Sequence, residues 1–266
     1  MTRTPKAWPV VRESAIAGYR EFRVFFTLRL WLGGWVVRLF FQVLFFSLAG
    51  LYVAGDTQIS YLLVGNALAV LALEGAVVAH AASAERDQGT LTSLVLSPGS
   101  VVLSMFSRGL LRIALATASS TIVLVTVLAV MRLDFPWVRL PALLPILVLV
   151  ASSCYGYGWF FGAIVYKFRN FRDTSTNLAY LLITMICGVN VPLGYWPGPV
   201  QVIAQFLPLT HGLLVVRALL GQIPPVDVPL HLLAEAAIGL CWTGLAGLLL
   251  HLFVESDRAT GRLELS

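Results

Sequence analysis

The sequence predicts an all-α polytopic membrane protein. Of the 266 residues, 58% are hydrophobic and only 12% are charged, whereas a soluble domain carries roughly 25% charged residues. The charges gather in a few short stretches and leave apolar runs longer than the roughly 18 residues that indicate a membrane helix. These runs are continuous rather than alternating, which argues against a transmembrane β-barrel.

Charge and cysteine content exclude several other classes. The net charge of +5 comes from the loops, and no basic run carries the interleaved aromatic residues that nucleic-acid binding favours. Cys154, Cys187 and Cys241 all lie inside apolar runs without a C-x-x-C pair, so neither a disulfide framework nor a zinc site is indicated. The mixed charge of the first thirty residues is unlike a cleaved signal peptide.

The chain divides into three parts. Residues 1–30 are expected to form a cytoplasmic tail and an amphipathic helix from about Val10 to Leu28. Residues 31–254 form one transmembrane domain, and residues 255–266 a cytoplasmic tail. A basic face opposite aromatic residues such as Tyr19 and Phe22 suits the membrane interface. The alternative is a soluble helix that packs on a partner.

Six spans are expected within the transmembrane domain. They are Gly34–Ala54, Ser60–Ala82, Leu110–Met131, Leu140–Tyr166, Asn177–Val191 and Leu230–Val254. No charged residue occurs from Thr174 to Val216, a stretch too long for one span at about 1.5 Å per residue across a core of about 30 Å. Its prolines predict a re-entrant helical hairpin over 195–222, before the last span.

Lysine and arginine predict the orientation. They concentrate in the first thirty residues, in 86–112, in 167–172 and after 255, whereas the opposite loops hold only Arg132, Arg139 and Arg217. The positive-inside rule therefore places both termini in the cytoplasm, as six spans require. No internal repeat is visible, so the inverted repeats of many secondary transporters are not supported.

The charged segment between the second and third spans predicts a short surface helix over 84–97. Ser83 is a suitable N-cap, Leu91, Leu94 and Val95 share one apolar face, and Pro98-Gly99 ends the helix. Such a helix suits a membrane subunit that receives a push from a soluble partner.

Two stretches resemble the type-2 membrane permeases of ATP-binding-cassette (ABC) exporters. The run Glu85-Arg86-Asp87-Gln88-Gly89-Thr90-Leu91 is close to the family's E-R-x-x-G-T-L. The run Leu207-Pro208-Leu209-Thr210-His211-Gly212, with Arg217 downstream, is close to an N-P-L-T-H stretch followed by Arg. Leu207 replaces the asparagine, so its role is not carried over. The layout matches over nearly the whole chain, the motifs over a small part.

The resemblance implies a transport subunit rather than an enzyme. The chain has no G-x-x-x-x-G-K-[ST] loop, so ATP and Mg would bind a separate cytoplasmic ABC ATPase, and this chain would hold no cofactor. Two permease copies, expected as a homodimer, would work with two ATPase copies. The coupling residues implied are Glu85, Arg86, Gln88, Gly89, Thr90, Leu91 and Leu94. The alternative for this segment is a surface helix that only closes a loop.

Three sets of residues in or near the spans are candidates for further roles. Glu74 is costly at membrane depth, so it either lines the cargo path or bonds across helices. Tyr155, Tyr157 and Trp159 either contact an apolar cargo or pack. The hairpin residues form either an extracellular gate or an anchor to headgroups, and they are Pro208, His211 and Arg217.

Two His–Glu pairs lie four residues apart in the last span. They are His231 with Glu235 and His251 with Glu255. A metal site would need a third ligand that the sequence does not supply, so local pairing is expected.

The function that these features favour is export of a lipophilic or amphipathic cargo from the cytoplasm or inner leaflet of the cell membrane. Drug or natural-product efflux, hence antibiotic resistance, is favoured only by the family resemblance of the coupling stretch. A lipid or lipid-linked polysaccharide exporter is the alternative. More distant alternatives are an intramembrane enzyme and a scaffold or sensor subunit. Membrane lipid is an expected contact, and nucleic acid is not.

Overall fold

In the computed structural model, the residues described are 7–25, 27–54, 56–81, 89, 100–131 and 137–260. The regular structure within them is entirely helical, as the sequence predicts. The α-helices are α1 (Ala7–Phe25), α2 (Leu28–Leu30), α3 (Val37–Ala54), α4 (Asp56–Val77), α7 (Val101–Arg108), α8 (Leu111–Val130), α9 (Leu140–Lys167), α10 (Arg172–Ile186), α11 (Gly198–Gln205), α12 (Thr210–Leu219) and α13 (Val228–Thr260). A π-helical turn, η1 (Trp31–Val36), joins α2 to α3.

Several helical segments are long and apolar enough to cross a membrane. Within the described residues they are Leu28–Tyr52, Ile59–Val77, Val101–Val130, Leu140–Lys167 and Val228–Ala259. Helices α11 and α12, bent by 89° relative to one another, make a sixth crossing if the pair is one broken span. The protein is therefore a multi-pass membrane protein.

The span limits differ from the expected ones in the middle of the chain. Helix α10 has 15 residues, about 22 Å at 1.5 Å per residue, and does not fill a hydrocarbon core of about 30 Å. The expected fifth span, Asn177–Val191, was therefore wrong in its limits. The backbone leaves the helix at Cys187, and Gly188 adopts a left-handed conformation with φ of 81°, which glycine accommodates without strain.

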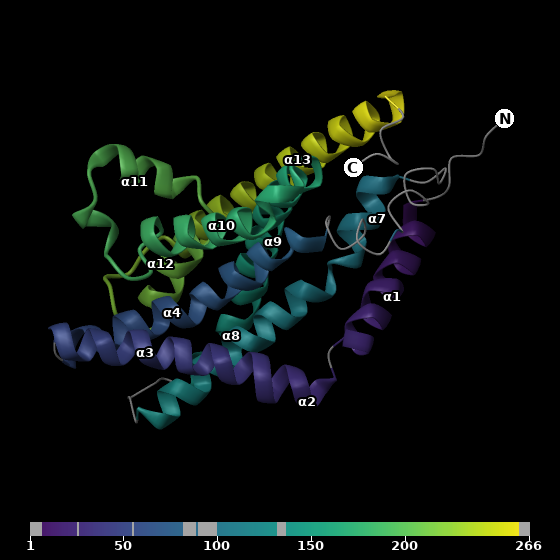
Figure 1. Cartoon of the computed structure of the whole chain (residues 1–266). Helices are drawn as coiled ribbons and strands as arrows, with labels where there is room; N and C mark the ends of the chain where they lie inside the picture. Colours follow the sequence, from purple (N-terminus) through teal and green to yellow (C-terminus); the bar gives the residue numbers. More distant parts are fainter. Residues whose placement is uncertain are drawn as a thin grey trace.

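The ends of the molecule differ in their elements. Helices α1 and α7 and the C-terminal end of α13 lie at one end, whereas the α3–α4 junction, α11 and α12 lie at the other (Figure 1). Helix α13 runs without a break through Glu255 to Thr260.

Helix α4 forms the centre of the bundle. Every residue from Leu63 to Ala72 is buried, and α4 contacts α3, α8, α9 and α10. A helix at the centre of a bundle can be apolar around most of its circumference, because no face of it meets water.

Glycines bring α4 and α9 into close backbone contact. A Cβ added to Gly75 would lie 2.6 Å from the Cys154 carbonyl oxygen, and one added to Gly158 would overlap the Gly75 carbonyl oxygen. Small residues at such crossings allow the dense packing that holds helices together in lipid.

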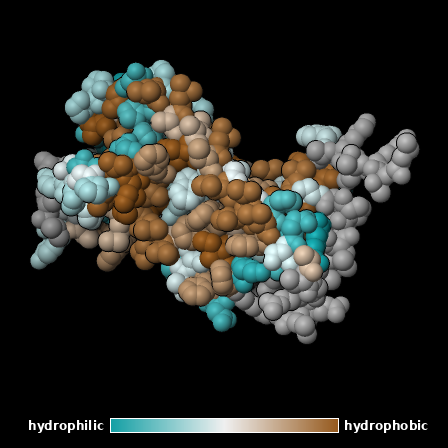
Figure 2. Space-filling view, turned by 90° about the horizontal axis from the view of Figure 1, so that it is seen from above, coloured by the Kyte–Doolittle hydropathy of each residue, from teal (hydrophilic) through white to brown (hydrophobic). Residues whose placement is uncertain are grey.

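The surface of the molecule fits a bilayer. Figure 2 shows mostly apolar side chains over the middle of the molecule and hydrophilic ones toward its ends. Large apolar side chains such as Phe41, Phe45 and Leu240 are exposed. In water such a surface would drive association, whereas lipid solvates it.

The glycine contact generates a stability prediction. Gly158→Ala places a methyl group against the α4 backbone, so we expect a loss of about 1–3 kcal/mol and a lower Tm of the detergent-solubilised protein. The matched control is Gly244→Ala on α13, where an added Cβ has no neighbour within 4 Å. Equal Tm values for the two variants would contradict the proposed close packing of α4 and α9.

Candidate functional site

The segment with the E-R-x-x-G-T-L motif lies almost wholly outside the described residues. This applies to Glu85, Arg86, Gln88, Thr90, Leu91 and Leu94, so their coupling role stays a prediction. Gly89 is described, and its φ of 68° is a conformation that suits glycine and few other residues. The chain resumes at Ser100, which caps α7 by accepting a hydrogen bond from the Leu103 amide at 3.3 Å.

The chain enters this segment beside the first turn of α10. Nε2 of His80 lies 3.7 Å from a carboxylate oxygen of Asp173. Burial lowers the pKa of His80, and the Arg172 charge lowers it further, so both favour the neutral imidazole. The contact joins α10 to the helical turn that follows α4.

Helix α7, which follows the predicted coupling segment, packs against α1. Nη2 of Arg108 on α7 lies 3.0 Å from Oε1 of Glu21 on α1. A Cβ on Gly18 would overlap the Arg108 carbonyl oxygen, so the two backbones lie in close contact. Helix α1 and α7 thus form one unit at the exit of the predicted coupling segment.

The three aromatic candidates for the cargo path are buried in helix packing. Tyr155, Tyr157 and Trp159 are at most 5% exposed. The Tyr155 hydroxyl donates to the Phe106 carbonyl oxygen, and the Trp159 ring stacks on Phe106 with centroids 4.8 Å apart. These contacts correspond to the packing alternative for this set.

The carboxylate of Glu74 joins three elements. Its Oε1 accepts hydrogen bonds from Trp35 Nε1 of η1 at 2.6 Å and from Ser119 Oγ of α8 at 3.3 Å. Its Oε2 lies 3.6 Å from Arg112 Nη1. Glu74 is 1% exposed, so it bonds across helices, which is one of the two roles that the sequence left open.

Arg217 is equally enclosed at the other end of the molecule. Its guanidinium donates to the carbonyl oxygens of Gly188 at 2.6 Å and of Val189 and Tyr61 at 3.1 and 3.2 Å. It also lies over the Tyr61 ring, 3.4 Å from the centroid. At 2% exposure it does not reach lipid headgroups. Arg217 instead ties α12 to α4 and to the turn after α10.

Glu235, which the sequence pairs with His231, has other partners. Its two carboxylate oxygens accept hydrogen bonds from the backbone amides of Leu209 at 2.9 Å and Gly212 at 3.1 Å. These amides belong to the N-terminus of α12. The expected His231–Glu235 pairing was therefore wrong, because a helix end that lacks a capping side chain offers the stronger donors.

His231 contacts His211 instead. The two Nδ1 atoms lie 2.9 Å apart, and Nε2 of His211 lies 3.2 Å from the Gln205 carbonyl oxygen. Since a carbonyl oxygen only accepts, His211 carries its proton on Nε2 and His231 donates from Nδ1. The second expected pair also differs, because Glu255 accepts a hydrogen bond from Arg258 at 2.7 Å.

The break between α11 and α12 is strained. Leu209 has a φ of 80°, a conformation that costs a non-glycine residue on the order of 1–3 kcal/mol. Pro208 lies within this break, and its carbonyl oxygen is 3.6 Å from Cys187 Sγ. The Thr210 hydroxyl donates to Ala204 of α11 at 2.7 Å. The break is therefore held by side chains from α12 and α13 and by Cys187 at the C-cap of α10.

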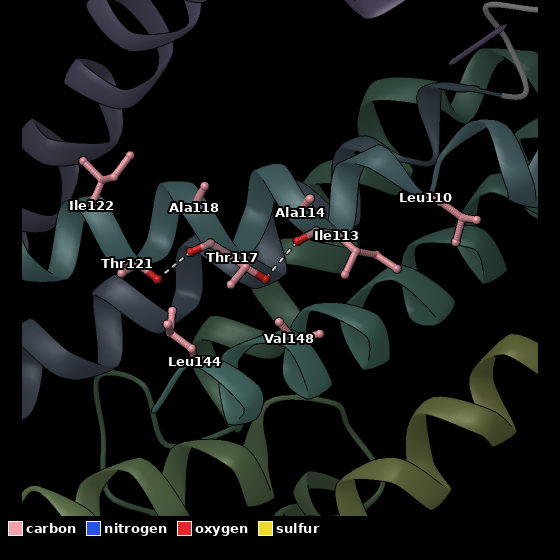
Figure 3. A pocket seen from close by; sticks show the side chains of 9 residues that line it. All are labelled: Leu110, Ile113, Ala114, Thr117, Ala118, Thr121, Ile122, Leu144 and Val148. Atoms are coloured by element: carbon pink, nitrogen blue, oxygen red, sulfur yellow. Dashed lines mark hydrogen bonds between the residues drawn. The ribbon is translucent and has the colours of Figure 1, made fainter. Parts of the chain in front are cut away.

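An apolar groove of about 610 Å³ lies between α8 and α9 (Figure 3). Its lining consists of Leu110, Ile113, Ala114, Thr117, Ala118, Thr121, Ile122, Leu144 and Val148. The Thr117 and Thr121 hydroxyls donate to the carbonyl oxygens one turn earlier in α8, at 2.9 and 2.7 Å. The groove surface is therefore almost wholly apolar in spite of its two threonines.

Comparison with known families identifies the chain. A family model described as ABC-2 type transporter matches residues 19–220. The chain belongs to this family. The matched region covers the predicted coupling segment and all of α12 but ends before α13. A search among curated proteins found no match to the chain.

Membership defines the protein as an ABC transporter permease. The permease is the membrane subunit of its transporter and works with an ABC ATPase subunit. This agrees with the all-helical architecture and with the apolar spans of the described residues.

Sequence reasoning missed two polar contacts of the permease. Asn66 lies inside a span and donates to the Asn190 side chain at 2.9 Å, and Glu235 caps a helix of the predicted hairpin. A polar residue in an apolar run signals that a partner exists. The identity of that partner depends on which helices meet, which no local pattern states.

The Glu74 cluster generates a second prediction. Glu74→Ala leaves the Trp35 indole and Arg112 without their shared acceptor, so we expect a loss of about 1–3 kcal/mol. Glu74→Gln keeps an acceptor oxygen and should lose less. Thermal unfolding of the purified permease measures the loss in both variants. A lower Tm for Glu74→Gln than for Glu74→Ala would contradict the role of Glu74 as a shared acceptor.

Proposed function

We propose that the permease exports a lipophilic or amphipathic cargo from the cytoplasm or inner leaflet, with drugs or natural products as the favoured class. One observation carries the cargo class. Among the described residues, the deeply buried charged groups of Glu74, Arg217 and Glu235 are all engaged by the protein itself. A charged cargo would have to displace these contacts, whereas an apolar cargo would not.

The groove between α8 and α9 supports the same cargo class. It is apolar and open to the outside of the bundle, so an apolar group can enter it from lipid. From Leu110 to Ile122 the groove follows twelve residues of α8, about 18 Å. This length is close to half of a hydrocarbon core of about 30 Å, so the groove also suits one acyl chain. A lipid or lipid-linked polysaccharide cargo is therefore the second candidate.

The driving force is proposed to enter through residues 84–97. Two ATPase copies would bind ATP and Mg and press on this segment in each of two permease copies, with both permease termini in the cytoplasm. The described flanks of the segment contact α10 through His80 and α1 through Arg108. A displacement of the segment would thus act on α1, α4, α7 and α10 together.

Substitutions in the coupling segment test this route. Glu85→Ala and Leu91→Asp should abolish cargo-stimulated ATP hydrolysis by the co-purified complex, because the predicted helix would lose side chains that contact the ATPase subunit. Both variants should still insert in the membrane at wild-type levels. Phe41→Ala on the exposed surface of α3 serves as the control. Wild-type cargo-stimulated ATP hydrolysis by both coupling variants would contradict the assignment of residues 84–97 as the coupling segment.

Filling the groove tests the cargo site. Ala114 is exposed and lines the groove, so Ala114→Trp should occupy the space without displacing the core. We expect cargo stimulation of ATPase activity in vesicles to fall at least several-fold for a lipophilic dye. Leu248→Trp on the exposed face of α13 is the matched control. A fluorescent phospholipid in parallel distinguishes the two cargo classes, and equal stimulation of both tryptophan variants would exclude the groove.

A further inference from the structure

We propose that Glu235 is a positioning residue for transport: from α13, its carboxylate holds the α11–α12 bend in the shape that cargo passage requires. This role rests on the permease activity of the family and not on the cargo class. It gives Glu235 a function beyond the region that the family model covers.

Glu235 supplies hydrogen-bond acceptors to the N-terminus of α12. The opening amides of a helix have no partner within that helix, and no water replaces the partner at membrane depth. The N-cap residue, Leu209, has no side chain that can accept a hydrogen bond. The two carboxylate oxygens of Glu235 accept hydrogen bonds from two of these amides, that of Leu209 at 2.9 Å and that of Gly212 at 3.1 Å. Its negative charge also faces the positive end of the α12 dipole.

The start of α12 lies in close contact with α9 and with Glu235. Glu235 is fully buried, and a Cβ on Gly212 would overlap Cγ2 of Val150 while lying 3.8 Å from Glu235 Oε2. Helix α12 can approach α9 and α13 this closely only because residue 212 is glycine. The Glu235 carboxylate and Gly212 therefore together fix the position of the start of α12.

Glu235 also binds the residue whose backbone is strained. Leu209 has a φ of 80°, which its own side chain disfavours. The amide of this same residue donates to Glu235. The hydrogen bond thus acts directly on the strained position, and its loss would allow the backbone to relax and the 89° bend to open.

The far end of α12 is held independently. Arg217 binds the carbonyl oxygens of Gly188 and Val189 after α10. With Arg217 in place, loss of the Glu235 bonds would leave the start of α12 held by the contacts of Thr210 and His211, which do not involve the Leu209 amide, so motion would concentrate at residues 206–209. Cys187 reports on that point, because its thiol is 1% exposed and lies 3.6 Å from the Pro208 carbonyl oxygen.

The experiment uses this native thiol in the co-purified complex with its ATPase. Cys241 is exposed and is replaced by Ser, whereas Cys154 is buried and is kept as an internal reference. Alkylation of Cys187 by N-ethylmaleimide is followed by mass spectrometry. We compare the wild-type background with Glu235→Gln and Glu235→Asp, and with Glu255→Gln as a control on the exposed end of the same helix.

We expect Cys187 to react about tenfold faster in Glu235→Gln, because one charge-assisted bond is lost and an amide donor then faces a backbone donor. Glu235→Asp keeps the charge but is one methylene shorter, so its rate should fall between the two. Cys154 should stay protected throughout, which separates local opening from unfolding. Cargo-stimulated ATPase activity should fall in the same order, and Glu255→Gln should match the background.

Unchanged protection of Cys187 in both Glu235 variants would overturn the proposal. Equal exposure of Cys154 and Cys187 would also overturn it, because Glu235 would then serve only general stability. If the complex with Glu235→Gln does not assemble, the Cys187 alkylation rate of Glu235→Asp is compared with that of the wild-type background, and this comparison decides. The alkylation readout needs no cargo, so an incorrect cargo class would abolish stimulation in every variant while leaving the order of Cys187 rates intact.

Discussion

The absence of water at membrane depth is the constraint on which this structure depends. A charged side chain or an open helix end inside the bundle must find its partners within the protein, since lipid offers none. Glu74 meets the constraint with an indole, a hydroxyl and a guanidinium from two neighbouring elements. Glu235 meets it with two backbone amides, and Arg217 with three backbone carbonyl oxygens. Each costly residue thereby becomes a tie between helices that are far apart in the sequence.

These ties lie toward the two ends of the permease. At one end, α1 is fastened to α7 and the end of the α4 segment touches α10, so the described flanks of the charged segment are both connected to the bundle. At the other end, α12 is held by Arg217 and Glu235. Helix α4 runs between the two ends and is buried along its middle. It carries Glu74 near one end, and Tyr61, which binds Arg217, near the other. In the proposed mechanism this close-packed central helix would carry displacement from one end to the other, because close-packed interiors transmit strain.

The chemistry of the spans also underlies the proposed cargo class. A cargo that moves beside apolar helices gains little from contact with them over contact with lipid. Its recognition must then come from shape and from a few polar groups. In the proposed function the α8–α9 groove would provide that shape, and its two threonines keep their hydroxyls bonded to their own helix.

The sequence by itself determined the class of the protein. Continuous apolar runs such as 140–167 require a membrane helix whatever their neighbours, because hydrophobic length is a local property. The helical break around Pro208 also follows from the sequence, because the effect of proline on a helix is confined to a few residues. The short motifs at 85–91 and 207–212 sufficed to indicate the permease family, which the match over 19–220 established.

Only the tertiary structure decided how the charged residues are used. The spacing of His231 and Glu235 favoured a local pair, yet Glu235 binds α12 and His231 binds His211. Likewise, the aromatic residues around Tyr157 proved to be enclosed by helices distant in sequence. Hydrogen-bond partners depend on which helices meet and on the backbone distance between them. That distance is set by contacts such as Gly75 with Gly158, and it becomes known only when the whole bundle is assembled.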